Sequence, residues 1–102
     1  MPENYDVIII GAGPAGIFAA LELKKLKPQM NVLLVDQGRS LNSRTCPARV
    51  TGKCVSCEPC AIITGWAGAG AFSDGKLSLS HEVGGNITDY MSEREAQSLI
   101  DY

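Results

Sequence analysis

The stretch VIIIGAGPAG occupies residues 7–16, and a second apolar run, VLLVD, occupies residues 32–36. Each run contains four consecutive branched apolar residues and lacks the polar alternation of a half-exposed strand. Such runs are typical of parallel strands that are buried on both faces. The sequence therefore predicts two neighbouring parallel strands, with a glycine-rich turn after the first and an acid, Asp36, after the second.

The segment between these runs predicts a helix over residues 15–26. Its small and apolar residues recur at spacings of three and four, which places them on one helix face against the sheet. These residues are Gly16, Ala19, Ala20, Leu23 and Leu26. Pro28 disfavours helical geometry at Lys27 and should end the helix there. We expect an α/β protein with a Rossmann-like fold, of which residues 1–40 form an N-terminal βαβ unit of a parallel sheet.

Strand, G-x-G-x-x-G turn, helix, strand and acid form the fingerprint of a dinucleotide-binding unit. Gly11 allows the tight turn, Gly13 leaves room for a pyrophosphate, and Gly16 lets helix and strand approach closely. The pyrophosphate would lie at the helix N-terminus, and Asp36 would accept hydrogen bonds from the adenosine ribose. The predicted nucleotide-binding residues here are Gly11, Gly13, Pro14, Ala15, Gly16, Asp36 and Gln37.

A second glycine-rich stretch, GWAGAGAFSDGKL, occupies residues 65–77. It has too many small residues for an ordinary helix and is too apolar for a solvated linker. Glycines would let its backbone approach a flat ligand, while a hydroxyl, an acid and a cation would lie near phosphate or ribitol. The alternative is a glycine-rich surface loop. The predicted cofactor-binding residues of this stretch are Gly68, Gly70, Ser73, Asp74, Gly75 and Lys76.

Two motifs carry a resemblance to known flavoproteins. The pattern G-x-G-x-x-G-x-x-x-A at residues 11–20 resembles the FAD-binding fold of glutathione-reductase-like flavoproteins, although that superfamily more often has Glu in place of Asp36. The pattern G-A-G-x-x-S-D-G-K-L at residues 68–77 resembles the uncharacterised FAD-dependent dehydrogenases of the same superfamily. The resemblance implies that residues 65–77 are a second FAD-contacting segment. It also implies a flavin-dependent oxidoreductase that takes electrons from NAD(P)H, and it leaves the substrate undefined.

All four cysteines lie within fifteen residues, as Cys46-x7-Cys54-x2-Cys57-x2-Cys60. The fingerprint begins immediately after the N-terminus without an apolar leader, so we expect synthesis in the cytoplasm, where structural disulfides are uncommon. Four thiolates at these spacings would suit a zinc ion or an iron–sulfur cluster. A reactive dithiol near the flavin and ordinary unligated thiols remain the alternatives.

Composition excludes several classes of function. The chain has 102 residues, a net charge of −2 and 20% charged residues, without a basic stripe or a long apolar run. We therefore expect neither nucleic-acid nor membrane binding, and the partner should be a small-molecule redox substrate or electron carrier. The absence of a Ser/His constellation or paired acids fits chemistry that belongs to a cofactor.

The organisation along the chain suggests the N-terminal part of a single FAD-binding domain over residues 1–102. A Cys-rich loop covers residues 44–60, and residues 77–80 alternate like a short, half-exposed strand. The pattern S-x-x-E at residues 92–95 opens a helix over residues 92–102 that we expect to continue past Tyr102. Only two strong strands are visible, so the unit should be incomplete. The open alternatives are an iron–sulfur flavoprotein, a non-catalytic nucleotide-binding module with a zinc-held loop, and an NAD-only protein, which residues 65–77 disfavour.

Overall fold

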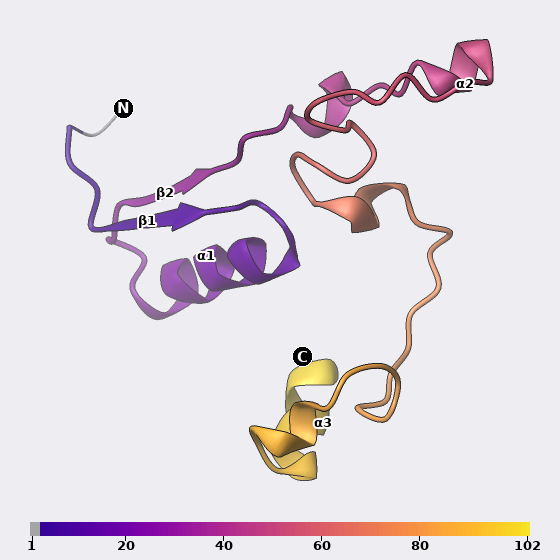
Figure 1. Cartoon of the computed structure of the whole chain (residues 1–102). Coiled ribbons are helices and arrows are strands. Elements are labelled where there is room, and N and C mark those ends of the chain that lie inside the picture. Colours follow the sequence, from indigo (N-terminus) through magenta and orange to yellow (C-terminus); the bar gives the residue numbers. More distant parts are fainter. Residues whose placement is uncertain (1–2) are drawn as a thin grey trace.

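The computed structural model describes residues 3–102, and its regular core is a βαβ unit. Strand β1 (Val7–Ile10) is followed by helix α1 (Pro14–Leu26) and strand β2 (Val32–Val35). The two strands are parallel, with Val7 opposite Val32 and Ile10 opposite Val35 (Figure 1). This confirms the predicted α/β class and Rossmann-like βαβ unit. The backbone of Lys27 is no longer helical, with φ −139° and ψ 81°, as expected for a residue that precedes proline.

The sheet is covered on one face only, which corrects the prediction that both strands are buried on both faces. Helix α1 contacts both strands, while Ile8 is 59% and Ile10 is 86% exposed on the other face. The branched apolar runs therefore predicted strands correctly, but no described element covers their second face.

The helix face that packs on the sheet is narrower than its apolar pattern predicted. Gly16, Ala20 and Leu23 are half-buried, but Ala19 and Leu26 are exposed. A sheet of two strands offers α1 only a narrow surface, so residues at the margin of the predicted stripe remain in contact with solvent.

Residues 40–92 follow an open path with short elements only. These are the 3₁₀ turns η1 (Leu41–Ser43), η2 (Ala69–Phe72) and η3 (Ile87–Asp89), and the single-turn helix α2 (Ala48–Thr51). The Cα radius of gyration is 16.9 Å, against about 13 Å for a compact chain of this length. The predicted strand at residues 77–80 is wrong, because the segment is irregular and pairs with no other strand among residues 3–102. Leu77 accordingly is 86% exposed.

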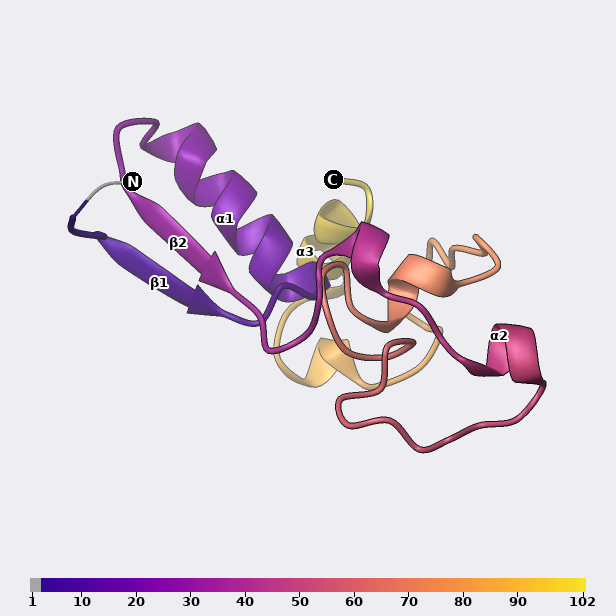
Figure 2. The same cartoon turned by 90° about the horizontal axis from the view of Figure 1, so that it is seen from above.

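Helix α3 (Glu93–Ile100) begins at the predicted capping box. The side chain of Ser92 accepts a hydrogen bond from the backbone N–H of Glu95, and the Glu95 carboxylate accepts one from the N–H of Ser92. The helix ends at Ile100, which corrects the expectation that it continues past Tyr102. Figure 2 shows the backbone of α3 and the C-terminus that follows it. The ring of Tyr102 meets that of Phe18 in α1 edge-on at 6.1 Å, and its hydroxyl donates a hydrogen bond to the Glu22 carboxylate.

Candidate functional site

The turn between β1 and α1 has the geometry that its glycines predict. Gly11 adopts φ +105°, a conformation that side chains disfavour, and its N–H donates to the carbonyl of Val35 at 2.7 Å. A Cβ atom on Gly16 would lie 1.9 Å from the carbonyl oxygen of Gly11. Only glycine at position 16 therefore lets the helix approach the turn this closely.

Gly13 is the N-cap of α1 and faces open space. No side chain caps the helix N-terminus, and a Cβ on Gly13 would meet nothing within 4 Å. Pro14 and Ala15 begin the helix and are exposed. The first N–H groups of a helix have no partner within the helix, and its dipole favours a negative charge there. The turn thus offers space, hydrogen-bond donors and favourable electrostatics to a pyrophosphate.

Asp36 ties the glycine turn to the end of β2. Its Oδ2 accepts a hydrogen bond from the N–H of Ala12 at 2.9 Å, and its Oδ1 accepts one from the N–H of Gly38 at 2.8 Å. These two bonds, that from Ala12 first, hold the pKa of Asp36 below its ordinary value, and the charge of Arg44 adds a smaller contribution. Sequence analysis missed this role in shaping the turn. Each oxygen keeps acceptor capacity, so a ribose contact remains compatible with it.

The second glycine-rich segment lies against the first. The N–H of Ala67 donates to the carbonyl of Ala12 at 2.8 Å, and a Cβ on Gly68 would be 3.5 Å from the Cα of Gly13. Two segments more than fifty residues apart in sequence therefore form one surface, as two parts of a single ligand site would require. Their adjacency could not be derived from either motif alone.

One glycine of the second segment serves the protein's own packing. A Cβ on Gly38 would lie 2.4 Å from the Cα of Gly65, and one on Gly65 would lie 2.7 Å from the carbonyl oxygen of Arg39. The close approach is thus between the loop after β2 and residue 65. Gly70 and Gly75 instead face open space, as close approach by a ligand requires.

The polar residues at the end of this segment are exposed and make local contacts. The N–H of Gly75 donates to the Ser73 hydroxyl at 3.1 Å, and Lys76 pairs with Asp74 at 3.4 Å. These residues and Gln37, which follows Asp36, are exposed. Their predicted cofactor contacts stay predictions, since no contact described for Ser73, Asp74, Gly75 or Lys76 reaches the glycine turn.

Arg44 holds the second segment in place, and sequence analysis did not identify it. It is only 5% exposed. Its Nε donates to Ala61 O at 2.8 Å, its Nη1 donates to Trp66 O at 2.6 Å and to Gly68 O at 2.8 Å, and its Nη2 donates to Ile62 O at 2.7 Å. One guanidinium therefore gathers four carbonyls of residues 61–68. No spacing or periodicity marks this arginine, which resembles any loop cation in the sequence.

Aromatic contacts extend this arrangement to η2. The guanidinium carbon of Arg44 lies 4.8 Å from the centre of the Phe72 ring, and that of Arg49 lies 5.2 Å from it. Cation–π contacts of this kind attach η2 to both arginines.

The four cysteines are all free thiols, and they do not converge on one point. Cys46 and Cys60 are half-buried, whereas Cys54 and Cys57 are exposed. Within residues 3–102, no three His, Cys, Asp or Glu side chains are placed to hold one metal ion. The donor set would suit zinc or an iron–sulfur cluster, but the geometry described here does not assemble it. The metal site stays a prediction, and no step of the function is derived through it.

None of the helices within residues 3–102 has the length and apolar character needed to cross a bilayer.

Comparison with known proteins agrees with the geometry of the site. Residues 5–96 match the family described as pyridine nucleotide-disulphide oxidoreductase. An uncharacterized protein of Methanosarcina barkeri is 45% identical over 51 residues, which are 50% of this chain and 13% of that protein. The digeranylgeranylglycerophospholipid reductase of Methanosarcina mazei is 31% identical, over 93% of this chain and 25% of the reductase.

A third relative is the mitochondrial electron transfer flavoprotein-ubiquinone oxidoreductase of Rattus norvegicus, 36% identical over 59% of this chain and 9% of the relative. The chain thus spans a quarter or less of the length of these three relatives. No solved structure gives a significant match. Because the family match covers most of its residues, this chain belongs to the pyridine nucleotide-disulphide oxidoreductase family.

Proposed function

We propose that this chain is the N-terminal part of the FAD-binding domain of an oxidoreductase. The observation that carries the proposal is the joining of two segments at one surface. There, the uncapped N-terminus of α1 at Gly13 lies beside Gly68, with the carboxylate of Asp36 bonded to the same turn. The name of the Rattus norvegicus relative includes a flavoprotein, which supports flavin chemistry, and the family supports an oxidoreductase.

Each part of this surface has a proposed role. Residues 11–16 hold the pyrophosphate on the N-terminus of α1, and Asp36 accepts hydrogen bonds from the adenosine ribose. The segment from Gly68 to Lys76 approaches the flavin half of the cofactor. In this assignment the βαβ unit of residues 1–40 binds the adenosine diphosphate portion, and residues 65–77 form the second FAD-contacting segment.

When bound, FAD supplies the hydride and single-electron chemistry, and the residues of this chain bind and orient it. We propose NAD(P)H as the electron donor, by resemblance to the FAD-dependent dehydrogenases. A small-molecule substrate or an electron carrier would accept the electrons. The relatives include both a reductase and an electron transfer flavoprotein-ubiquinone oxidoreductase, which supports either kind of acceptor.

The visible absorption spectrum of the protein at its full natural length, purified without oxygen, tests this proposal. Resolved flavin bands on a flat background are expected. Flavin bands on a broad, reducible shoulder would instead establish the iron–sulfur flavoprotein. A flavin-containing protein that NAD(P)H cannot reduce would contradict the proposed donor, and a colourless protein would favour an NAD-only or non-catalytic module.

The substitution Gly13→Val tests the binding surface directly. The valine side chain would occupy the open space in front of the helix N-terminus, so we expect FAD content to fall to near zero. Because Gly13 has an extended backbone and its Cβ would meet nothing within 4 Å, the FAD-free variant should unfold at about the same denaturant concentration as the FAD-free parent. Unchanged flavin content in the variant would refute the assignment of the glycine turn.

A further inference from the structure

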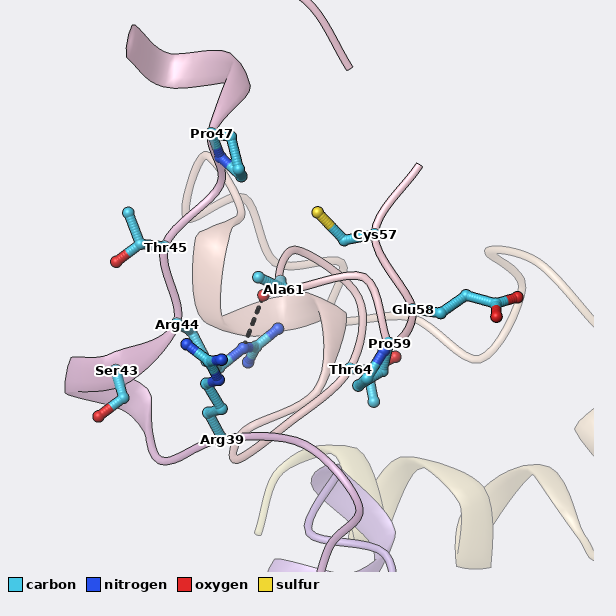
Figure 3. Close-up of a pocket in the computed structure, with 10 residues that line it drawn as sticks. All are labelled: Arg39, Ser43, Arg44, Thr45, Pro47, Cys57, Glu58, Pro59, Ala61 and Thr64. Atoms are coloured by element: carbon cyan, nitrogen blue, oxygen red, sulfur yellow. Dashed lines mark hydrogen bonds between the residues drawn. The ribbon is translucent and has the colours of Figure 1, made fainter. Parts of the chain in front are cut away.

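A cavity of about 250 Å³ lies beside the loop that leaves β2. Figure 3 shows its lining, which comes from two stretches of chain, residues 39–47 and residues 57–64. No residue of the glycine turn lines it. The cavity is therefore distinct from the surface to which we assign the FAD pyrophosphate.

The wall of the cavity contains a buried cation that lacks an ion pair. Arg44 lines the cavity and is only 5% exposed. The two salt bridges among the described residues are Lys25–Glu22 and Lys76–Asp74, so neither involves Arg44. Carbonyl dipoles accept four hydrogen bonds from its guanidinium, which has five N–H groups in all. One Nη2–H thus remains available. The charge of Arg44 helps to lower the pKa of Asp36, but no carboxylate among the described residues forms an ion pair with Arg44, and burial of an unpaired cation is costly.

A second guanidinium lines the same cavity. Arg39 is exposed, and its side chain makes no hydrogen bond or ion pair within residues 3–102. Figure 3 shows the side chains of Arg39 and Arg44 directed into the same space, whereas the carboxylate of Glu58 points away from them. The positive charge at this end of the cavity is consequently not neutralised by the acid in its lining.

The hydroxyl groups in the lining do not join the two arginines, because Figure 3 shows those of Ser43 and Thr45 directed away from the guanidinium groups. Ser43 and Thr45 both border the cavity, and the Ser43 hydroxyl accepts a hydrogen bond from the Ser40 hydroxyl at 3.2 Å. The anion-binding groups of the cavity are therefore its two guanidinium groups, which is the side-chain chemistry by which proteins recognise phosphate and carboxylate groups.

We propose that this cavity binds the oxyanion group, phosphate or carboxylate, of a small molecule other than FAD. Arg39 supplies the exposed contact, and Arg44 supplies the buried charge. Since Arg44 also holds the carbonyls of Trp66 and Gly68, the anion would neutralise the cation that holds the second glycine-rich segment. The ligand would thus be linked to the proposed cofactor surface through Arg44 without contacting its glycines.

Calorimetric titration of inorganic phosphate and, separately, of acetate into the protein at its full natural length tests the site. Both titrations are run on FAD-free and on FAD-loaded protein at constant ionic strength adjusted with chloride. We expect saturable binding of at least one anion in both forms, and the tighter of the two identifies a phosphate or a carboxylate ligand. Arg39→Gln should weaken that binding about tenfold or more, because it removes charge-assisted hydrogen bonds.

Arg94→Gln is the matched control, because Arg94 is exposed and does not line this cavity. Its affinity should equal that of the parent. If Arg94→Gln weakened anion binding as much as Arg39→Gln, the binding would reflect only general electrostatic attraction to the protein surface, and the proposal would be overturned. Unchanged binding in Arg39→Gln, or no saturable binding of either anion, would also overturn it. Anion binding that FAD abolishes would make the cavity part of the cofactor site. Absorbance measures FAD content independently of the titrations. A protein that does not bind FAD can therefore be distinguished from one that does not bind the anion.

Discussion

The βαβ unit of residues 7–36 and the loop region of residues 39–72 are held together by different kinds of hydrogen bond. In the first, backbone groups bond to each other along a parallel ladder and a helix of 13 residues. In the second, four long-range bonds begin at one side chain, that of Arg44. The loop region has few long-range backbone bonds, among them Trp66 N–H to Arg39 O and Ala67 N–H to Ala12 O.

Because their hydrogen bonds differ in kind, the two regions are sensitive to different substitutions. A ladder and a helix distribute their stability over many similar bonds, so most single substitutions remove only a small part of it. A loop that depends on one guanidinium loses most of its order with one substitution. The two halves of the proposed cofactor surface should therefore fail in different ways, and each can be tested separately.

The largest effect is expected from Arg44→Met. Methionine fills similar volume but leaves four carbonyl groups without their donor. A fully buried, unsatisfied carbonyl costs about 1–3 kcal/mol, and these four are only partly buried. Relaxation toward water reduces the total, so we expect a loss of about 4 kcal/mol in the free energy of unfolding. Hydrogen exchange should accelerate in peptides that cover residues 61–72 and change little in those that cover β1 and β2.

Arg49→Met provides the control for that substitution. Arg49 also lies over the Phe72 ring, but it is exposed and donates no side-chain hydrogen bond within residues 3–102. Its replacement should change the free energy of unfolding by about 0.5 kcal/mol. If the two variants behaved alike, the four carbonyl bonds would not be what orders the loop region.

A smaller but still large effect is expected from Gly16→Ala in the βαβ unit. The new Cβ would lie 1.9 Å from the carbonyl oxygen of Gly11, and because this neighbour is backbone it cannot rotate away. We expect a loss of about 3 kcal/mol in the free energy of unfolding, measured by denaturant titration. Without the clash, alanine would stabilise a helix by about 1 kcal/mol, so a gain in stability would contradict the close approach. Gly13→Ala, with open space around its Cβ, is the control and should change the free energy by less than about 1 kcal/mol.

Gly16 and Arg44 differ in how far their roles could be predicted from the sequence. The requirement at Gly16 is local, because a residue five positions away sets it, and a spacing pattern therefore reveals it. The bonds of Arg44 join residues 17 to 24 positions apart through a fold that only tertiary packing determines. No pattern in the sequence distinguishes this arginine from Arg39, five residues earlier.

The strand predictions also succeeded where the signal was local and failed where a strand needed a distant partner. Apolar runs predicted β1 and β2 correctly, since a branched run has few other stable uses. Alternation at residues 77–80 predicted a strand wrongly, because alternation indicates a face but does not supply a neighbouring strand with which to pair. The cysteine spacing likewise indicates a possible ligand set, whereas whether the thiols converge depends on the path of the loop.

In helix α3 a side chain also bonds to the backbone, but this bond is local, so the sequence predicts it. Ser92→Ala removes the oxygen that accepts from the N–H of Glu95 at 3.2 Å, and we expect a loss of about 1 kcal/mol in the free energy of unfolding. Ser98→Ala, an exposed change within the same helix, should have almost no effect. A larger effect for Ser98 than for Ser92 would show that the cap does not set the start of α3.

The smallest effect is expected where the two regions meet, at the carboxylate of Asp36. The hydrogen bonds from Ala12 and Gly38 lower the pKa of Asp36 below its ordinary value of 3.8. A carboxylate with a lowered pKa in the folded state contributes stability above the unfolded pKa and loses it as pH falls through the folded value. The stability difference between the parent and Asp36→Asn should therefore be constant above about pH 5 and shrink below pH 4. Gln37→Ala, a neighbouring change without a titrating group, should give a difference that does not vary over this range. If the Asp36→Asn difference grew as pH fell, protonation of Asp36 would stabilise the folded state. The charged carboxylate could then not be what holds the glycine turn to the end of β2.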